Sequence, residues 1–169
     1  VAMGASHPIL ESSPQRAPPQ ARVVSRDEEY SNIVSEHAVD LILRLSNEIE
    51  DLTIVSIGPM TNVAVALLRD PTLARRARLV SMAGYYFSPR AEYNVKCDPE
   101  AVEVVLRSGI NPLLVGLDVT LKCVMRGDEL RALYSLDTPQ AKLLCKLIDI
   151  WREGVGGALP ILHDPLALT

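Results

Sequence analysis

Short apolar runs alternate along the chain with longer stretches of helical periodicity. Three runs rich in Val, Leu and Ile, each within two residues of a glycine, cover residues 52–57, 78–82 and 112–116. Such runs, bounded by turn residues, predict buried strands. Apolar residues three and four positions apart predict helices over residues 32–47, 63–68, 98–109, 128–135 and 138–153. The alternation predicts an α/β fold, a mostly parallel sheet flanked by helices as in Rossmann-like proteins.

Two of these helices carry recognisable start signals. Thr61 offers a hydroxyl that can cap the helix after the first predicted strand. Asp98-Pro99-Glu100 combines an acceptor for backbone N–H groups, a proline at the first helical position and an acid favoured by the helix dipole. Gly109 is placed to close that second helix.

The chain is expected to be a single α/β domain fragment over residues 1–169. Residues 1–31 form a proline-rich arm and loop, because proline fixes φ and removes a backbone donor. Residues 32–169 carry the alternating strands and helices. With 48% hydrophobic residues, a chain of this length can bury a substantial core.

Composition excludes several classes of partner. A net charge of −4 without a dense basic run argues against nucleic acid, and the arginines within residues 75–78 are interpreted as a solvated helix end. No run approaches the ~18 apolar residues of a membrane span. Three distant cysteines argue against a zinc site or a disulfide framework and favour a reducing, cytoplasmic compartment: Cys97, Cys123 and Cys145.

Polar side chains after the predicted strands are candidates for chemistry. Glu92 and Asn94 stand two apart, so an extended backbone would point both to one face, where they could hold neighbouring hydroxyls of a sugar. The alternative is an ordinary loop acid and a turn-forming asparagine. Asp118 follows the third predicted strand, where it either faces a ligand or ties down its own loop.

His163-Asp164-Pro165 is the other candidate for chemistry. Histidine suits proton transfer near neutral pH, and an aspartate suits a hard cation such as Ca²⁺. The alternative is Asp164 as a helix N-cap before Pro165, with His163 as a half-exposed neighbour. His7 and His37 gather no partners in the sequence and are interpreted as structural or solvated.

Five short motifs follow one another in a fixed order. They are Ile57-Gly58-Pro59-Met60-Thr61-Asn62, Met82-Ala83-Gly84, Ala91-Glu92-Tyr93-Asn94 with Cys97-Asp98-Pro99-Glu100-Ala101, Leu117-Asp118-Val119-Thr120, and His163-Asp164-Pro165-Leu166-Ala167. Together they resemble the calcium-dependent, inosine-uridine-type nucleoside hydrolases. The resemblance runs from Val1 to Thr169 and covers roughly the middle half of a typical family chain. It implies hydrolysis of the N-glycosidic bond of ribonucleosides to ribose and free base, with Ca²⁺ holding the ribose diol and the attacking water.

The resemblance also implies a role for six residues. These roles are calcium ligation for the Asp164 carboxylate and the Ile57 backbone carbonyl, ribose binding for Glu92 and Asn94, lining of the sugar pocket for Met82, and proton supply to the leaving base for His163.

The chain departs from the family pattern in three places. The family opens with D-T-D-x-G-x-D-D, which supplies the catalytic base and most calcium carboxylates, whereas the nearest acids here are residues 27–29, with another spacing. Tyr86 stands six residues before Glu92, where the family often has asparagine, in a loop that is shortened. A His-Gly-x-Asp-Gly-type segment is replaced by V-V-S-R-D at residues 23–27.

These observations lead to two hypotheses about function. In the first, the complete protein hydrolyses purine or pyrimidine ribonucleosides as a homodimer or homotetramer, and this chain alone is inactive. In the second, the chain is a non-catalytic binding or assembly module that keeps the fold without the metal. We also expect residues 52–57 and 78–82 to lack a neighbouring strand, leaving an apolar sheet edge or face.

Overall fold

The computed structural model describes residues 1–10, 18–23 and 32–169. Its elements are β1 (Ala2–Met3), the 3₁₀ helix η1 (Pro19–Val23), β2 (Val34–His37), α1 (Ala38–Glu48), β3 (Leu52–Ser56), α2 (Thr61–Arg69), α3 (Leu73–Arg76), β4 (Ala77–Met82), α4 (Tyr93–Cys97), α5 (Pro99–Arg107), β5 (Leu113–Val115), α6 (Leu117–Thr120), α7 (Gly127–Tyr134), α8 (Pro139–Gly154) and α9 (His163–Ala167). Residues 11–17 of the predicted arm and the acids at 27–29 lie outside the described residues. In the part that is described, no helix is long and apolar enough to cross a membrane.

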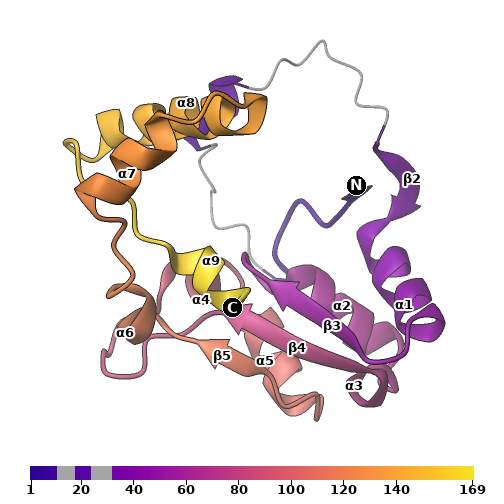
Figure 1. Ribbon diagram of the computed structural model, residues 1–169. Coiled ribbons are helices and arrows are strands. Elements are labelled where there is room, and N and C mark those ends of the chain that lie inside the picture. Colours follow the sequence, from indigo (N-terminus) through magenta and orange to yellow (C-terminus); the bar gives the residue numbers. More distant parts are fainter. Residues whose placement is uncertain (11–17, 24–31) are drawn as a thin grey trace.

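The central sheet is parallel and has the strand order β3-β4-β5 (Figure 1). Pairing runs from Leu52↔Ala77 to Ser56↔Ser81 between the first two strands and continues between β4 and β5. Parallel neighbours require crossover connections, and helices supply both of them here. This confirms the predicted α/β fold. The expectation that residues 78–82 lack a neighbour is wrong, because β5 pairs with the edge of β4 that β3 leaves open.

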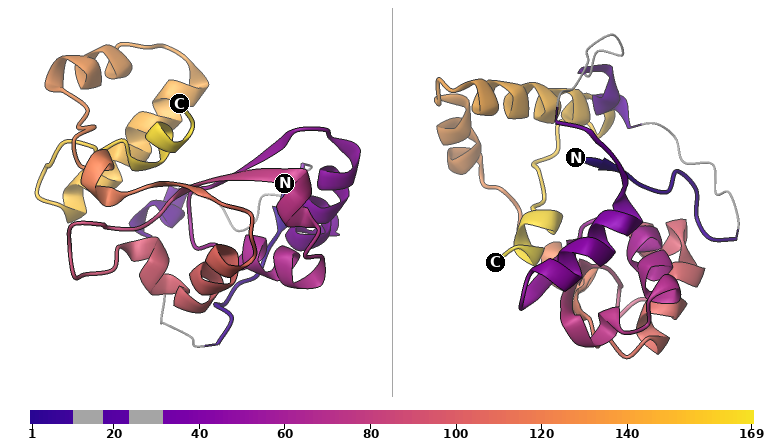
Figure 2. Two further views of the ribbon diagram at one scale, coloured as in Figure 1. Left: turned by 90° about the horizontal axis from the view of Figure 1, so that it is seen from below. Right: turned by 90° about the vertical axis from the view of Figure 1, so that its right-hand side faces the viewer.

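One face of the sheet is covered by α1, α2, α3 and α5, as Figures 1 and 2 show. The strands contribute Leu52, Ile54, Leu79 and Leu114 to a single hydrophobic core. The helices contribute small and branched residues to it: Val39, Val63, Ala64, Ala66, Leu67, Leu73, Ala101 and Val105. Alternation along each strand therefore assigns one face to this core.

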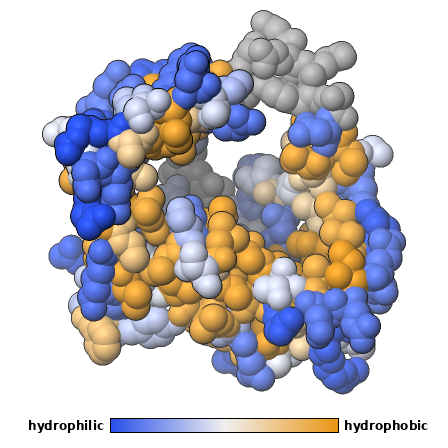
Figure 3. All heavy atoms as spheres, in the orientation of Figure 1, coloured by the Kyte–Doolittle hydropathy of each residue, from blue (hydrophilic) through white to orange (hydrophobic). Residues whose placement is uncertain are grey.

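The opposite face of the sheet is apolar as well but less covered. Val55, Val80 and Val115 are half-buried on it, whereas Ile57 and Leu113 are 47% and 64% exposed. Figure 3 shows apolar residues gathered over the region of the sheet on the side turned to the viewer. Helix α9 packs near β4, while α7 and α8 lie apart from the sheet, with η1 against α8 (Figure 1).

The amino-terminal part of the predicted first helix is a strand. Residues 34–37 form β2, which pairs in parallel with β1, and the helix begins only at Ala38. The β-branched Ile33 and Val34 favour extended backbone. His37 then caps α1, because its Nδ1 accepts a hydrogen bond from the Val39 N–H at 3.2 Å. This capping bond confirms the interpretation of His37 as a structural residue.

Asp98 joins three chain segments through one buried carboxylate. It is the N-cap of α5, as predicted, and its Oδ1 accepts from the Ala101 N–H at 3.0 Å. Its Oδ2 accepts from the Thr61 hydroxyl at 2.5 Å and from the Ile9 N–H at 3.1 Å. The expectation that Thr61 caps α2 is wrong: the N-cap is Met60, and the Thr61 hydroxyl donates to a charged acceptor instead.

Candidate active site

A pocket opens at the carboxyl ends of β3 and β4, beside α9. Its volume is about 280 Å³, and its lining residues are Ile57, Met82, Glu92, Tyr93, Asn94, Leu117, His163 and Asp164. In open α/β sheets this is the end where ligands bind. The structure brings all six residues of the predicted site into this one pocket. Sequence reasoning missed Tyr93 and Leu117, although both belong to the quoted motifs.

Glu92 is held by backbone N–H groups on both sides of the loop that follows β4. It is the N-cap of α4, and its carboxylate accepts from the N–H groups of Asn94 and Val95, each at 2.7 Å, and from that of Gly84 at 3.3 Å. Only 5% of the residue is exposed. The extended backbone considered for residues 92–94 ends at Glu92, because the capping bonds start a helix there. Both side chains nonetheless line the pocket.

Asn94 ties the first turn of α4 to the end of β4. Its Nδ2 donates to the Met82 carbonyl at 2.9 Å. Met82 is 4% exposed. Strand end, loop and helix start are thus fastened together by two side chains, which makes this wall of the pocket rigid.

The His163-Asp164 segment starts a short helix, but Asp164 is not its N-cap, contrary to the structural alternative considered for this segment. Helix α9 begins at His163 with Leu162 as its N-cap, and no side chain caps it. Asp164 lies in the first turn and is therefore not the cap. Nδ1 of His163 lies 2.7 Å from the hydroxyl of Thr120, the last residue of α6.

The carboxylate of Asp164 is partly desolvated. Burial raises its pKa, and the neighbouring His163 opposes that rise only in part. Among the described residues, none donates a hydrogen bond to it or pairs with it as a cation. A partly buried carboxylate in this state has the chemistry of a ligand for a hard cation.

The described residues do not complete a calcium site. Nowhere among residues 1–10, 18–23 and 32–169 do three His, Cys, Asp or Glu side chains gather with metal-binding geometry. Asp164 and Ile57 line the same pocket, yet Ca²⁺ takes about six to eight oxygen ligands. These two groups fit part of such a shell and no more.

A short antiparallel bridge holds α9 in place. Val124 pairs with Ile161, the Met125 N–H donates to the Pro160 carbonyl at 2.8 Å, and the Leu162 N–H donates to the Cys123 carbonyl at 2.8 Å. The chain leaves toward α7 and α8 at this bridge and returns at it. His163 is therefore positioned by two contacts: the bridge at Ile161, which precedes it in the chain, and the hydroxyl of Thr120.

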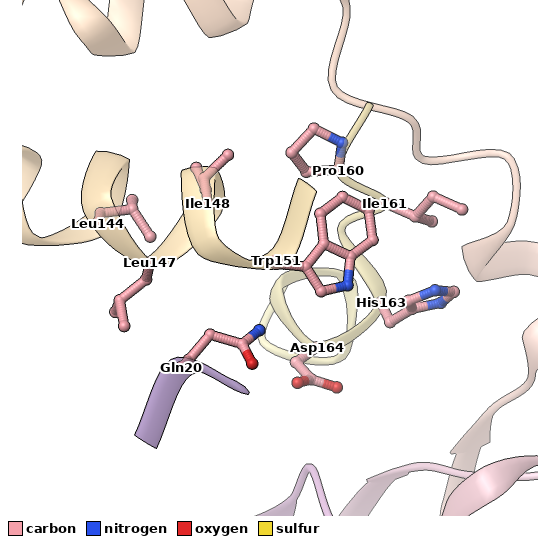
Figure 4. A pocket seen from close by; sticks show the side chains of 9 residues that line it. All are labelled: Gln20, Leu144, Leu147, Ile148, Trp151, Pro160, Ile161, His163 and Asp164. Atoms are coloured by element: carbon pink, nitrogen blue, oxygen red, sulfur yellow. The ribbon is translucent and has the colours of Figure 1, made fainter. Parts of the chain in front are cut away.

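A second, larger pocket adjoins the first one and shares two of its residues. It encloses about 510 Å³ between α8, η1 and α9, and Figure 4 shows its lining: Gln20, Leu144, Leu147, Ile148, Trp151, Pro160, Ile161, His163 and Asp164. The Trp151 side chain is turned toward the segment that carries His163 and Asp164 (Figure 4). Within the described residues, Oε1 of Gln20 is buried without a hydrogen-bond partner.

Sequence reasoning missed this second pocket. Trp151 is the single tryptophan of the chain and lies on a predicted helix, which was a usable signal. Gln20 gave no signal, because it stands in the proline-rich arm and reaches the pocket only through the packing of η1 on α8.

Asp118 shapes the loop beside the first pocket and does not line it. Its carboxylate accepts from the N–H groups of Tyr86 at 2.7 Å and Phe87 at 3.1 Å. Desolvation would raise the pKa of Asp118, but these backbone hydrogen bonds outweigh it and lower the pKa. The Tyr86 ring lies over Gly116, where an added Cβ would come within 2.6 Å of it. Of the two roles predicted for Asp118, the structure shows the anchoring of a loop. The anchored loop is the one that carries Tyr86, and not the loop of Asp118 itself.

Comparison with known proteins gives one consistent picture. The sequence profile of the inosine-uridine preferring nucleoside hydrolases matches residues 1–169. The pyrimidine-specific ribonucleoside hydrolase RihA of Salmonella newport is 38% identical over 145 residues, which cover 78% of this chain and 46% of that protein. RihA from a strain of Escherichia coli is 37% identical over the same length.

Two solved structures resemble the fold closely. A purine-preferring ribonucleoside hydrolase from Gardnerella vaginalis superposes with a TM-score of 0.82 at 29% identity, over 98% of this chain and 58% of that one. A plant nucleoside hydrolase superposes with a TM-score of 0.82 at 25% identity, over 99% of this chain and 58% of that one. The chain spans about half the length of the curated relatives it matches.

Proposed function

The chain belongs to the inosine-uridine preferring nucleoside hydrolase family, and we propose that it supplies the ribose-binding wall and the base-side histidine of a ribonucleoside hydrolase. The reaction is hydrolysis of the N-glycosidic bond, which yields ribose and a free base. The observation that carries the proposal is the single pocket that gathers Ile57, Met82, Glu92, Asn94, His163 and Asp164. These six residues come from separate segments, and a chance cluster would not place all six on one cavity.

The first pocket suits the sugar. The Glu92 carboxylate has acceptor capacity beyond its three backbone bonds, and the Asn94 amide retains its oxygen, so the two can hold neighbouring ribose hydroxyls. Met82 supplies an apolar surface under the ring. A fixed carboxylate near the sugar also stabilises the positive charge that develops at C1′ as the glycosidic bond breaks.

The second pocket suits the base. Its lining is mostly aliphatic, and the Trp151 indole offers a planar surface for a purine or pyrimidine ring. His163 and Asp164 belong to both pockets, so they lie where sugar and base are joined. His163 is then the donor that meets the base as it leaves.

The family's calcium is part of the proposal for a longer protein. When bound, Ca²⁺ supplies a template for the ribose diol and for the attacking water. Asp164 and the Ile57 carbonyl would contribute two oxygens, and further oxygen ligands are needed to complete the shell. We therefore expect this chain alone to release no free base.

A chimera tests the proposed function. The part of this chain that aligns with Salmonella RihA would replace the corresponding segment of that protein, with the remainder of RihA kept. We expect release of free base from uridine or inosine by the chimera and none by the isolated chain. A chimera that folds and binds calcium but releases no base would reject the hydrolase and favour the non-catalytic alternative.

Two variants of the chimera separate the roles of neighbouring residues. Asp164→Ala should abolish activity together with calcium affinity in a calorimetric titration, because the template for both reactants is lost. His163→Ala should leave calcium affinity intact and lower kcat by about 10²–10⁴-fold, the typical contribution of a general acid. Unchanged calcium affinity in Asp164→Ala would show that Asp164 is not a ligand.

A further inference from the structure

The hydroxyl of Thr120 is the immediate neighbour of the His163 ring. The two groups lie 2.7 Å apart, and Thr120 is 0% exposed. The backbone around Thr120 is fixed as well: its N–H donates to the Gly116 carbonyl at 3.2 Å, and its carbonyl accepts from the Cys123 N–H at 2.9 Å. A fully buried hydroxyl cannot turn to water, so its proton must find an acceptor within the protein.

Two acceptors are within reach of that proton among the described residues. The Leu117 carbonyl lies 3.5 Å from Oγ1, at the limit of a hydrogen bond, whereas Nδ1 of His163 lies at 2.7 Å. The Thr120 hydroxyl therefore donates its hydrogen to Nδ1 of His163, the nearer of the two acceptors. Nδ1 of the neutral ring then acts as an acceptor, and in a neutral imidazole the other nitrogen must carry the hydrogen.

We propose that Thr120 is a positioning residue, which fixes the neutral His163 ring in the tautomer that carries its hydrogen on Nε2. Because the two nitrogens lie on different edges of the ring, Nε2 is the nitrogen left for a ligand in the two pockets. His163 thus presents a donor to that ligand at all times and never a bare nitrogen.

The consequence for catalysis rests on the proposed function. A leaving base gains electron density as its bond to C1′ breaks, and a fixed Nε2–H can stabilise that density through a hydrogen bond without any rearrangement of the ring. A ring in the other tautomer would turn a lone pair toward the same atoms and repel them. Thr120 therefore affects the rate through His163 and touches no substrate itself.

Histidine NMR of this chain tests the tautomer without any activity. With ¹⁵N-labelled histidine at about pH 9, where histidine side chains are ordinarily neutral, long-range ¹H–¹⁵N correlations show which nitrogen carries the hydrogen. The chain has three histidines, and a His163→Gln variant assigns the signals of interest. We expect a protonated Nε2 and a bare Nδ1 in the wild-type chain. A hydrogen on Nδ1 overturns the proposal.

Two substitutions test whether Thr120 is the cause. Thr120→Val keeps the shape and removes the donor, so the two ¹⁵N shifts of His163 should move toward each other as both tautomers become populated. Thr120→Ser should restore the wild-type pattern. An unchanged pattern in Thr120→Val overturns the assignment. His37 is an internal control, since its Nδ1 accepts from Val39 in a different part of the fold and should not change.

The active chimera gives the corresponding kinetic result. Thr120→Val should lower kcat roughly tenfold with little change in KM, because part of the hydrogen-bond stabilisation of the leaving base is lost, and Thr120→Ser should recover it. An equal kcat in Thr120→Val and wild type overturns the catalytic part of the inference. If the tautomer pattern holds in a chimera that has no activity, the proposed function fails while the tautomer assignment stands.

Discussion

Replacing Glu92 by glutamine should destabilise this chain even when no substrate is present. The carboxylate accepts three backbone N–H groups and is almost fully buried. A glutamine in the same position can keep its oxygen toward Val95 and Gly84, but its NH₂ group then faces the Asn94 N–H. The Asn94 N–H then loses its acceptor, and the hydrogen bonds from the N–H groups of Val95 and Gly84 go to a neutral acceptor instead of a charged one.

The magnitude follows from these three bonds. A buried donor left without a partner costs about 1–3 kcal/mol. Bonds to a charged acceptor are roughly twice as strong as neutral ones, so the other two together lose about 1 kcal/mol. The sum is about 2–4 kcal/mol, a large part of the ~5–15 kcal/mol that stabilises a typical domain.

Urea unfolding monitored by circular dichroism measures this loss, and Glu129→Gln is the matched control. Glu129 also accepts a backbone N–H, that of Arg126 at 2.7 Å, but it caps an exposed helix start. Its replacement should cost less than about 1 kcal/mol. A loss below about 1 kcal/mol in Glu92→Gln, or one equal to that of the control, would refute the capping argument. Any activity lost in this variant would then be attributed to ribose contact alone.

Three further predictions concern other parts of the chain. Asp98→Ala should lower the free energy of unfolding by about 3–6 kcal/mol, because three donors lose a charged acceptor; a loss under about 1 kcal/mol in urea would contradict this. The hydroxyl of Thr72 and then the guanidinium of Arg76 lower the pKa of Asp70 to about 2, so its contribution to stability is present above about pH 4 and disappears as the pH falls through 2. Thermal melts of Asp70→Asn and wild type should therefore differ at pH 5 and converge near pH 2; a constant difference would contradict the ion pair. In the active chimera, Trp151→Ala should raise KM about tenfold for uridine and inosine, because a stacking surface is lost, and an unchanged KM would exclude the second pocket as the base site.

The fold was predictable where local signals and burial agree. The three apolar runs became β3, β4 and β5 because each is too short and too rich in branched residues for a buried helix. The Asp98 start signal gave the right N-cap, and Gly109 has the positive φ of 84° that a closing glycine adopts. Prediction failed at residues 34–37, where pairing with β1, a contact across more than thirty residues, outweighed the helical pattern.

The candidate site was predictable in its residues but only partly in their geometry. Motif order identified the six residues of the first pocket, since each lies at the end of a strand or at the start of a helix. The capping bonds of Glu92 and the contact of His163 with Thr120 depend on packing between segments far apart in sequence. The roles of the six residues, the homo-oligomeric state and the cytoplasmic location stay predictions.

The bridge between Val124 and Ile161 has a consequence for how such proteins diversify. The chain leaves toward α7 and α8 at this bridge and returns at it, so the bridge holds together the two ends of the segment 126–159. Insertions, deletions or replacement of this segment therefore leave the contacts that position α9 unchanged. Trp151 lies in this segment, whereas His163 and Glu92 lie outside it. Evolution, or an engineer grafting helices between relatives, can therefore change what the neighbouring cavity accepts while inheriting the sugar-facing residues intact.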